Sequence, residues 1–435
     1  MRLKHLFIIA SFILVSGNSL QSQATVMINK DRLESSIFEL AKFGQKENGE
    51  TSRVAFSDAD VASRAYVMNL MKAVGMEVSI DFAGNIIGFK AGTDSSKKTI
   101  SFGSHIDTVP DGGNYDGCVG SMAAIEVMWT FMEENVHTTH PLELIIFSNE
   151  EGGVMGSRAL AGELGESALN VVNSTGFSMR EGIERLGGNP KLLAEVVRKK
   201  GQMAAFLELH IEQGAILDQE NIDIGIVEGI VGLNWWDVEI SGFANHAGTT
   251  PMDMRQDALL AASKFIIAVN DAANSYEGKQ VATVGKIAAE PGAPNVIPGK
   301  VTLSLEIRDL SSEVIQKLFL DIEQRAKKIA EESGTEIRFR ALDTTGKPAL
   351  TTVFVQDKIK MAAEKLGLSH KNMQSGAGHD AQDMALIAPT GMIFVPSKNG
   401  ISHSPEEFTT AEDMANGANV LLQTILILDK YLIKK

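Results

Sequence analysis

Apolar residues along the chain alternate between short continuous runs and stretches of helical periodicity. The runs at 99–103, 142–147, 205–209 and 392–396 are typical of buried strands. Between them, as at 117–134, apolar residues recur every three or four positions and predict helices. Because strands that alternate with helices form parallel sheets wrapped by helices, the pattern predicts an α/β fold with a mainly parallel sheet.

Elements of a different kind precede this alternation. Residues 30–53 have a helical pattern, and a second helix is expected at 57–74. Residues 77–81 and 85–90 alternate like strands on either side of a turn, which predicts a hairpin.

The pattern changes near residue 232 and returns to its earlier form near residue 352. The intervening elements follow the order strand, helix, strand, strand, helix, strand, which is typical of a ferredoxin-like α+β module. They are expected at 234–241, 256–273, 281–288, 300–308, 313–333 and 335–342. We therefore predict a discontinuous catalytic domain in two parts, 25–232 and 352–435, with the module inserted at 233–351.

Residues 1–24 have the three-part form of a secretory signal peptide. A basic start at 1–5 is followed by an apolar run at 6–15 and by small polar residues. A retained membrane anchor is the alternative, but the apolar run is short for a bilayer span. We expect cleavage between Ser19 and Ala24, and a secreted or periplasmic protein that has no membrane segment after signal removal.

Composition narrows the possible partners and chemistry. A length of 435 residues fits two domains, and the formal net charge of −15 argues against nucleic acid or an anionic membrane surface as partner. Cys118 is the only cysteine, which excludes an intramolecular disulfide. We interpret Cys118 as a small buried apolar residue, not as a nucleophile.

Each of the four strand-like runs leads into a cluster of His, Asp or Glu residues. Ligands gather beyond the carboxyl ends of the strands in an open α/β sheet, so these side chains are expected to converge. They are His105, Asp107, Asp116, Glu150, Glu151, His210 and His403. Three imidazoles with carboxylates and no thiolate suit zinc, manganese, cobalt or nickel. The sequence thus predicts a metal-dependent hydrolase.

Taken singly, these residues leave several roles open. Asp107 is placed to orient the His105 imidazole, and Asp116 could bridge two metals or cap a helix. Glu150 and Glu151 point in different directions because successive side chains alternate, so one could bind metal while the other acts as general base. An exposed acidic turn is the alternative for that pair. His246 lies in the inserted module, where a simple ligand role is less natural.

At these residues the chain resembles the dinuclear metal amidohydrolases of the aminoacylase and zinc-carboxypeptidase superfamily. Within it, the chain is most similar to the branch of N-carbamoyl-L-amino acid hydrolases, allantoate amidohydrolases and β-ureidopropionases, and a His at position 210 favours this branch. The matching segments are GSHIDTVPDGGNYDGCVG, FSNEEGG, ELHIEQG, ANHAGTTPMDMRQDAL, PNVIPGKVTLSLEIRD, SGAGHDAQDMA and GISHSPEEF, which together span residues 103–408.

The resemblance implies two divalent metal ions per subunit, zinc or else manganese, cobalt or nickel. His105 and His210 would hold one ion, Glu151 and His403 would hold the other, and Asp116 would bridge them. It also implies a cis peptide bond after Asp116.

Further roles follow from the same resemblance. Glu150 would be the general base, and the inserted module would be a lid that also forms a homodimer. His246 would reach into the partner subunit's site and stabilise the oxyanion there. The substrate-binding residues would be Gln213, Asn295, Arg308 and Gly378, with Arg308 pairing with a substrate carboxylate.

The predicted activity is hydrolysis of linear C–N bonds in small carboxylate-bearing carbamoyl or ureido compounds. N-carbamoyl-L-amino acids are the leading substrates, allantoate is the second, and an aminoacylase or dipeptidase activity is the third. Gly152-Gly153-Val154-Met155 and Trp235-Trp236 depart from the pattern of similar proteins and leave the substrate open. A catalytically silent binding protein is disfavoured, because the predicted ligands and Glu150 are all present.

Overall fold

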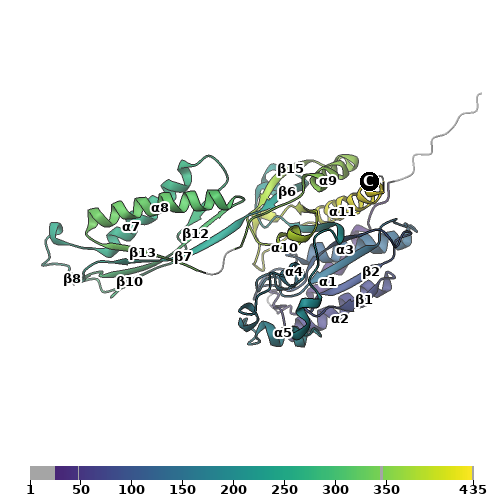
Figure 1. The fold of residues 1–435 in the computed structure, drawn as a ribbon, viewed down its shortest axis with the longest axis horizontal. Helices are drawn as coiled ribbons and strands as arrows, with labels where there is room; N and C mark the ends of the chain where they lie inside the picture. Colours follow the sequence, from purple (N-terminus) through teal and green to yellow (C-terminus); the bar gives the residue numbers. More distant parts are fainter. Residues whose placement is uncertain (1–24, 48, 343–345, 434–435) are drawn as a thin grey trace, which may run out of the picture.

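The computed structural model describes residues 25–47, 49–342 and 346–433, so the predicted signal peptide lies outside the described residues. Figure 1 shows a larger lobe, built from the N- and C-terminal parts of the chain, and a smaller lobe beside it. No helix in the described ranges is long and apolar enough to cross a membrane.

A mixed sheet runs through the larger lobe. Its four central strands, β4, β3, β5 and β16, are parallel to one another, and the β1–β2 hairpin extends one edge antiparallel to β4. The strand order is β1 (Glu77–Ile80), β2 (Ile86–Lys90), β4 (Leu142–Phe147), β3 (Thr99–His105), β5 (Met203–Ile211), β16 (Thr390–Val395), β6 (Ile224–Ile230) and β14 (Ala349–Leu350), with β15 (His370–Ser375) also paired to β6.

Helices cover both faces of this sheet. The central strands are buried on both sides, which explains their continuous apolar runs. On one face the core includes α1 (Lys30–Ala41), α2 (Asp58–Ala73), α3 (Cys118–Glu133), α9 (Val353–Leu366) and α11 (Ala411–Leu432). On the other it includes α4 (Met155–Ala161), α6 (Ile216–Glu220) and α10 (Asp380–Ile387). The short α5 (Met179–Arg185) belongs to a satellite cluster. This confirms the predicted α/β class.

The smaller lobe is an antiparallel sheet covered by two helices. The strand order is β10 (Ile287–Glu290), β12 (Lys300–Asp309), β7 (Gly232–Ser241) and β13 (Glu336–Ala341), with β9 (Val281–Thr283) also paired to β12. The sheet packs against α7 (Ala258–Ser275) and α8 (Ser312–Ser333). A separate ladder joins β8 (Asn245–His246) to β11 (Val296–Ile297). The order of elements and strands is that of the predicted ferredoxin-like module.

Two element boundaries differ from the prediction. The helix expected at 30–53 ends at Ala41, because Gly44 adopts a φ of +91° and the chain then turns back to pair Thr51 with Gly112. The single strand expected at 281–288 is divided into β9 and β10, whose registers on β12 differ by one residue. Strand β6 was not predicted.

Candidate active site

The predicted metal ligands converge at the carboxyl ends of the central parallel strands. His105 is the last residue of β3, and His210 is the penultimate residue of β5. Glu151 follows β4, and His403 follows β16 after a short 3-10 turn. Asp116 lies just before α3. Parallel strands bring these residues to one edge of the sheet although up to 298 positions separate them along the chain.

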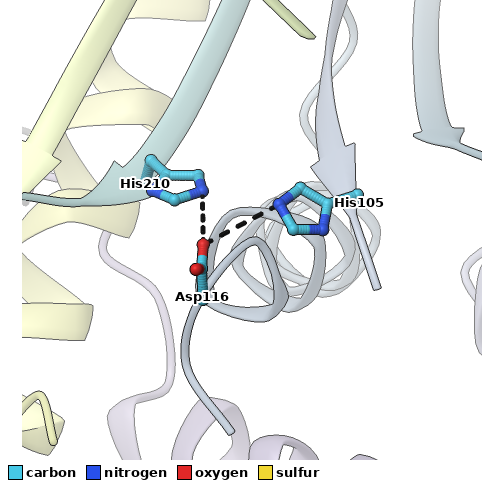
Figure 2. Close-up of side chains that lie close together, drawn as sticks. All are labelled: His105, Asp116 and His210. Atoms are coloured by element: carbon cyan, nitrogen blue, oxygen red, sulfur yellow. Dashed lines mark ion pairs between the residues drawn. The ribbon is translucent and has the colours of Figure 1, made fainter. Parts of the chain in front are cut away.

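The two carboxylate oxygens of Asp116 face different partners. Oδ1 lies 3.0 Å from Nε2 of His210 and 3.8 Å from Nε2 of His105, as Figure 2 shows. Oδ2 lies 2.9 Å from Nε2 of His403, which is itself 3.5 Å from Oε2 of Glu151. Asp116 is therefore shared by two groups of three ligands, and in each group the ligand atoms lie within 4.8 Å of one another.

The hydrogen bonds of the two buried histidines set their tautomers. Nδ1 of His105 lies 3.0 Å from the carbonyl oxygen of Asp107, and Nδ1 of His210 lies 2.9 Å from that of Ile211. Because a carbonyl oxygen can only accept, each Nδ1 carries a proton and each Nε2 is available toward Asp116. A backbone carbonyl on the far ring nitrogen is the usual support of a metal-bound histidine. The donor set and its tautomers fit a pair of divalent cations.

Gly117 allows the close approach of His105 to Asp116. A Cβ atom at this position would lie 2.2 Å from Nε2 of His105, and the backbone has a φ of +64°. The peptide bond after Asp116 is trans, since the one cis bond in the described residues joins Glu290 and Pro291. The prediction of a cis peptide bond, which the resemblance implied, is therefore wrong. The left-handed conformation of Gly117 makes the turn between Asp116 and α3 instead.

The pKa values at the site reflect the burial of the ligands and their clustered charges. Burial lowers the pKa of His105 to about 4. Burial also opposes protonation of His210, but its hydrogen bond to Asp116 outweighs this and raises the pKa to about 9. The hydrogen bond to Asp116 likewise raises the pKa of His403 to about 9, and burial raises the pKa of Glu151 to about 8. Protons on His210, His403 and Glu151, but not on His105, therefore occupy positions where a divalent cation would displace them.

Asp116 itself remains ionised. Burial alone would raise the pKa of its carboxyl group, but hydrogen bonds from His210 and His403 hold that pKa well below 3.8. A permanently charged carboxylate between two ligand groups is suited to bridging two cations.

Glu150 lies on the His105 side of the site, with Oε2 3.6 Å from Nε2 of His105. It is only 9% exposed, and burial, followed by the nearby charges of Asp380 and Glu151, raises its pKa well above 4.5. Burial and neighbouring negative charge thus disfavour the ionised form of this carboxylate, which favours uptake of a proton.

Asp107 supports the site through a contact that the sequence did not predict. Its carboxylate lies 3.7 Å from Nδ1 of His105, and its backbone carbonyl accepts that hydrogen bond instead. The carboxylate oxygens accept hydrogen bonds from the backbone N–H groups of Glu150 and Glu151, both at 3.2 Å. The Asp107 carboxylate thus orients the Glu150–Glu151 turn, whereas its backbone carbonyl orients the His105 ring.

A third group of ligand-type side chains lies deeper in the larger lobe. It consists of Glu208, His210 and His379, all buried. The His379 ring packs edge-on against His210 with centroids 4.5 Å apart, and its Nε2 lies 2.8 Å from Oγ of Ser375. Sequence reasoning missed Glu208 and His379, although both lie inside segments that carried the resemblance.

The predicted substrate-binding residues fall into three places, and two of them adjoin the larger lobe. Gln213 lies at the metal-ligand cluster, where Nε2 donates to Oδ2 of Asp116 at 2.8 Å. Arg308 lies on β12 and donates from Nη1 to the carbonyl of Gly376 at 2.6 Å, in the same loop as Gly378. This contact joins the two lobes.

His246 and Asn295 lie together but away from this cluster. His246 is paired with Val296 across the β8–β11 ladder, and the N–H of Ala247 donates to the carbonyl of Asn295 at 3.0 Å. Both residues are exposed, and β8 lies at the end of the smaller lobe farthest from the larger one (Figure 1). Within one chain, the structure does not bring them to the predicted metal ligands.

Sequence comparison identifies the family. The profile of the peptidase family M20/M25/M40 matches residues 101–427. The chain belongs to this family. It is 39% identical over 404 residues to an N-carbamoyl-L-amino acid amidohydrolase of Geobacillus stearothermophilus, covering 92% of this chain and 98% of the relative. It is 38% identical over 419 residues to a ureidoglycolate hydrolase of Arabidopsis thaliana, covering 94% of this chain and 88% of that protein.

A solved structure agrees with the sequence comparison. An amidase of the hydantoinase/carbamoylase family from Burkholderia multivorans superposes with a TM-score of 0.87 at 33% identity, covering 93% of this chain and 98% of the other. These findings confirm the resemblance and the fold class. The grouped His, Asp and Glu side chains of this M20 family member are candidate ligands for a metal-dependent hydrolase.

Proposed function

We propose that this protein is a metal-dependent amidohydrolase that cleaves a linear C–N bond in N-carbamoyl-L-amino acids. The observation that carries the proposal is the position of the Asp116 carboxylate between two groups of ligands. One of its oxygens faces His105 and His210, and the other faces the group of His403 and Glu151. Such a shared carboxylate is what a dinuclear hydrolytic site requires.

Two divalent cations held by these five residues would polarise the scissile carbonyl and make a water molecule more acidic. The all-N/O donor set favours zinc, manganese, cobalt or nickel. Glu150 accepts the proton of the attacking water and returns it to the leaving nitrogen, because its buried carboxylate has a raised pKa. Arg308 offers the substrate carboxylate a planar, permanently charged guanidinium.

His246 would act on the site of a partner subunit in a homodimer. Its Nδ1 accepts hydrogen bonds from the N–H groups of Gly248 and Thr249, at 3.0 and 3.2 Å. The remaining ring nitrogen, Nε2, is then the protonated one. An exposed N–H group of this kind suits an oxyanion that develops during the reaction.

Exposed apolar side chains support the homodimer. They surround β8 and lie along α7 in the smaller lobe: Phe243, Met252, Met254, Leu260 and Ile267 are each more than half exposed. Several large apolar side chains exposed on one lobe are candidate contacts for a partner. A second copy seated there would cover this surface and bring its own His246 toward the neighbouring site.

The substrate test uses purified protein that lacks residues 1–24, reconstituted in parallel with manganese and with zinc. We expect amine and ammonia release from N-carbamoyl-L-amino acids, with slower or no release from allantoate, ureidoglycolate and dipeptides. Ureidoglycolate belongs in the panel because the similarity to the Arabidopsis enzyme is almost as high. Release from dipeptides alone would refute the carbamoyl assignment.

We also propose that residues 1–24 direct export and are then removed, so that the enzyme works outside the cytoplasm. The basic, apolar and small-residue order of this segment supports this. N-terminal sequencing of the protein recovered from the periplasm or medium should give a start between Leu20 and Thr25. Recovery of the uncleaved chain from the cytoplasm alone would refute it.

A further inference from the structure

Glu407 is a buried carboxylate beside the site to which neither the motifs nor the proposed chemistry assign a role. Its side chain is only 4% exposed, and it lies four residues after His403 in the loop that leads from β16 to α11. A buried carboxylate must have its oxygens satisfied, or it destabilises the fold.

Both oxygens of Glu407 are satisfied by the loops that carry two of the predicted metal ligands. Oε1 accepts hydrogen bonds from the backbone N–H groups of Tyr115 and Asp116, at 2.8 and 3.0 Å. Oε2 accepts from Oγ of Ser402 at 2.9 Å and from the N–H of His403 at 3.3 Å. One side chain thus contacts the backbone of the bridging ligand and the backbone of a terminal ligand.

The neighbouring residues leave room for this arrangement. A Cβ atom on Gly113 would lie 2.4 Å from Oε1 of Glu407, so this glycine provides the space that the carboxylate fills. The two loops also touch through aromatic rings, since Tyr115 packs edge-on against Phe408 with centroids 5.7 Å apart. Asp116 and His403 are 287 residues apart in sequence, and these contacts hold their loops together.

We propose that Glu407 is a positioning residue that fixes the spacing between Asp116 and His403, and that metal affinity depends on it. The inference rests on the proposed dinuclear site. Side chains behind metal ligands typically change metal affinity by about 10- to 100-fold when they are altered. Glu407 would act in this way through the backbone of the ligands, since its hydrogen bonds to both loops end at main-chain N–H groups and one hydroxyl.

The test compares metal binding by the wild type, Glu407→Gln and Gly113→Ala. A Gln side chain has one carbonyl oxygen and one NH₂ group, so it can accept from only one of the two loops and presents a donor to the other. Ala at position 113 displaces the Glu407 carboxylate without changing its charge. Matched controls are Glu406→Gln, whose side chain is exposed, and Gly165→Ala, where the nearest atom to an added Cβ is 3.9 Å away.

The readouts are zinc and manganese dissociation constants from chelator competition, metal content after dialysis, and the unfolding temperature of the metal-free proteins. For the metal ion that binds less tightly of the two, we expect both variants to have a dissociation constant about 10- to 100-fold higher than that of the wild type. The two controls should match the wild type. The metal-free unfolding temperatures of the two variants should stay within a few degrees of the wild type.

The outcomes separate this proposal from the proposed function. A wild type that takes up no divalent metal would overturn the metal centre itself. If the wild type binds metal and Glu407→Gln binds it with the same affinity, only the positioning role is overturned. A large fall in the metal-free unfolding temperature of both variants would also overturn it, because Glu407 would then support the fold in general. If Glu407→Gln does not fold, the affinity of Gly113→Ala decides the question.

Discussion

The two lobes hold their functional residues in opposite ways. In the larger lobe, His105 and His210 are each 1% exposed and each has a backbone hydrogen bond that orients its ring. In the smaller lobe, His246 and Asn295 are exposed, and β8 lies far from the predicted ligands (Figure 1). One chain therefore preorganises His105 and His210 as candidate metal ligands, whereas it leaves His246 and Asn295 exposed and away from them.

This difference separates two requirements of the proposed reaction. A metal centre needs fixed ligand geometry, which burial and hydrogen bonds behind the ligands provide. A substrate must enter and leave, so groups that contact it can be supplied by a lid or a second subunit that closes over the site. The contact between Arg308 and the carbonyl of Gly376 is one point where the two lobes already meet.

The largest expected effect is in the larger lobe. Glu150→Gln removes the proton acceptor but preserves the shape of the side chain, so turnover should fall by about 10²- to 10⁴-fold. Metal content should remain that of the wild type, because Glu150 is not among the predicted ligands. Turnover and metal content per chain are measured together, with Glu77→Gln at the exposed start of β1 as control. Unchanged turnover would remove Glu150 as the general base.

The next prediction tests whether the smaller lobe completes the site of a partner. His246→Ala should lower turnover by about 10²- to 10³-fold, as loss of an oxyanion donor does. When Glu150→Gln and His246→Ala homodimers exchange subunits, each mixed dimer should contain one intact site. Random exchange should then restore about a quarter of wild-type activity in a symmetric dimer. No recovery, with exchange confirmed by mass spectrometry, would mean that each site is built within one chain.

Arg308→Lys tests the junction between the lobes. Lysine keeps the charge but loses the planar fork, so KM for a carboxylate substrate should rise by about 10-fold, with a smaller change in kcat and none in metal content. The control is Arg338→Lys on β13, an exposed residue paired with Glu336. Equal KM values for both variants would place the carboxylate elsewhere.

The smallest effect concerns stability and pH. Asp383 lies on α10, and burial raises its pKa to about 7. Because the folded-state pKa is above the ordinary value of 3.8, the favourable contribution of the protonated group is complete below about pH 4 and is lost as the pH rises through about 7. Asp383→Asn should therefore leave stability unchanged at pH 4 and increase it by about 1–2 kcal/mol at pH 8.5.

The measurement is the unfolding temperature of Asp383→Asn and wild type at the two pH values. Asp357→Asn, at an exposed position on α9, is the matched control. A gain of the same size at both pH values would show that the charge of Asp383 is not its cause.

Much of this protein follows from its sequence. The continuous apolar runs determine the central strands, because strands buried on both faces must be apolar throughout. The change of periodicity near residue 232 determines the ferredoxin-like module, and the polar residues after each run indicate where the ligands gather. Each of these signals lies within a short segment of the chain, so it can be recognised in the sequence without knowledge of the fold.

Other features depend on contacts between distant segments. The sequence contains Glu407 but does not reveal that its carboxylate joins the Asp116 and His403 loops. It does not show that the carboxylate of Asp107 holds the Glu150–Glu151 turn, or that His246 lies away from the ligands of its own chain. Residue types and spacing set which elements form and which chemistry is possible. The partner of each polar atom is decided only when the tertiary structure removes water and leaves each buried donor or acceptor to find a neighbour.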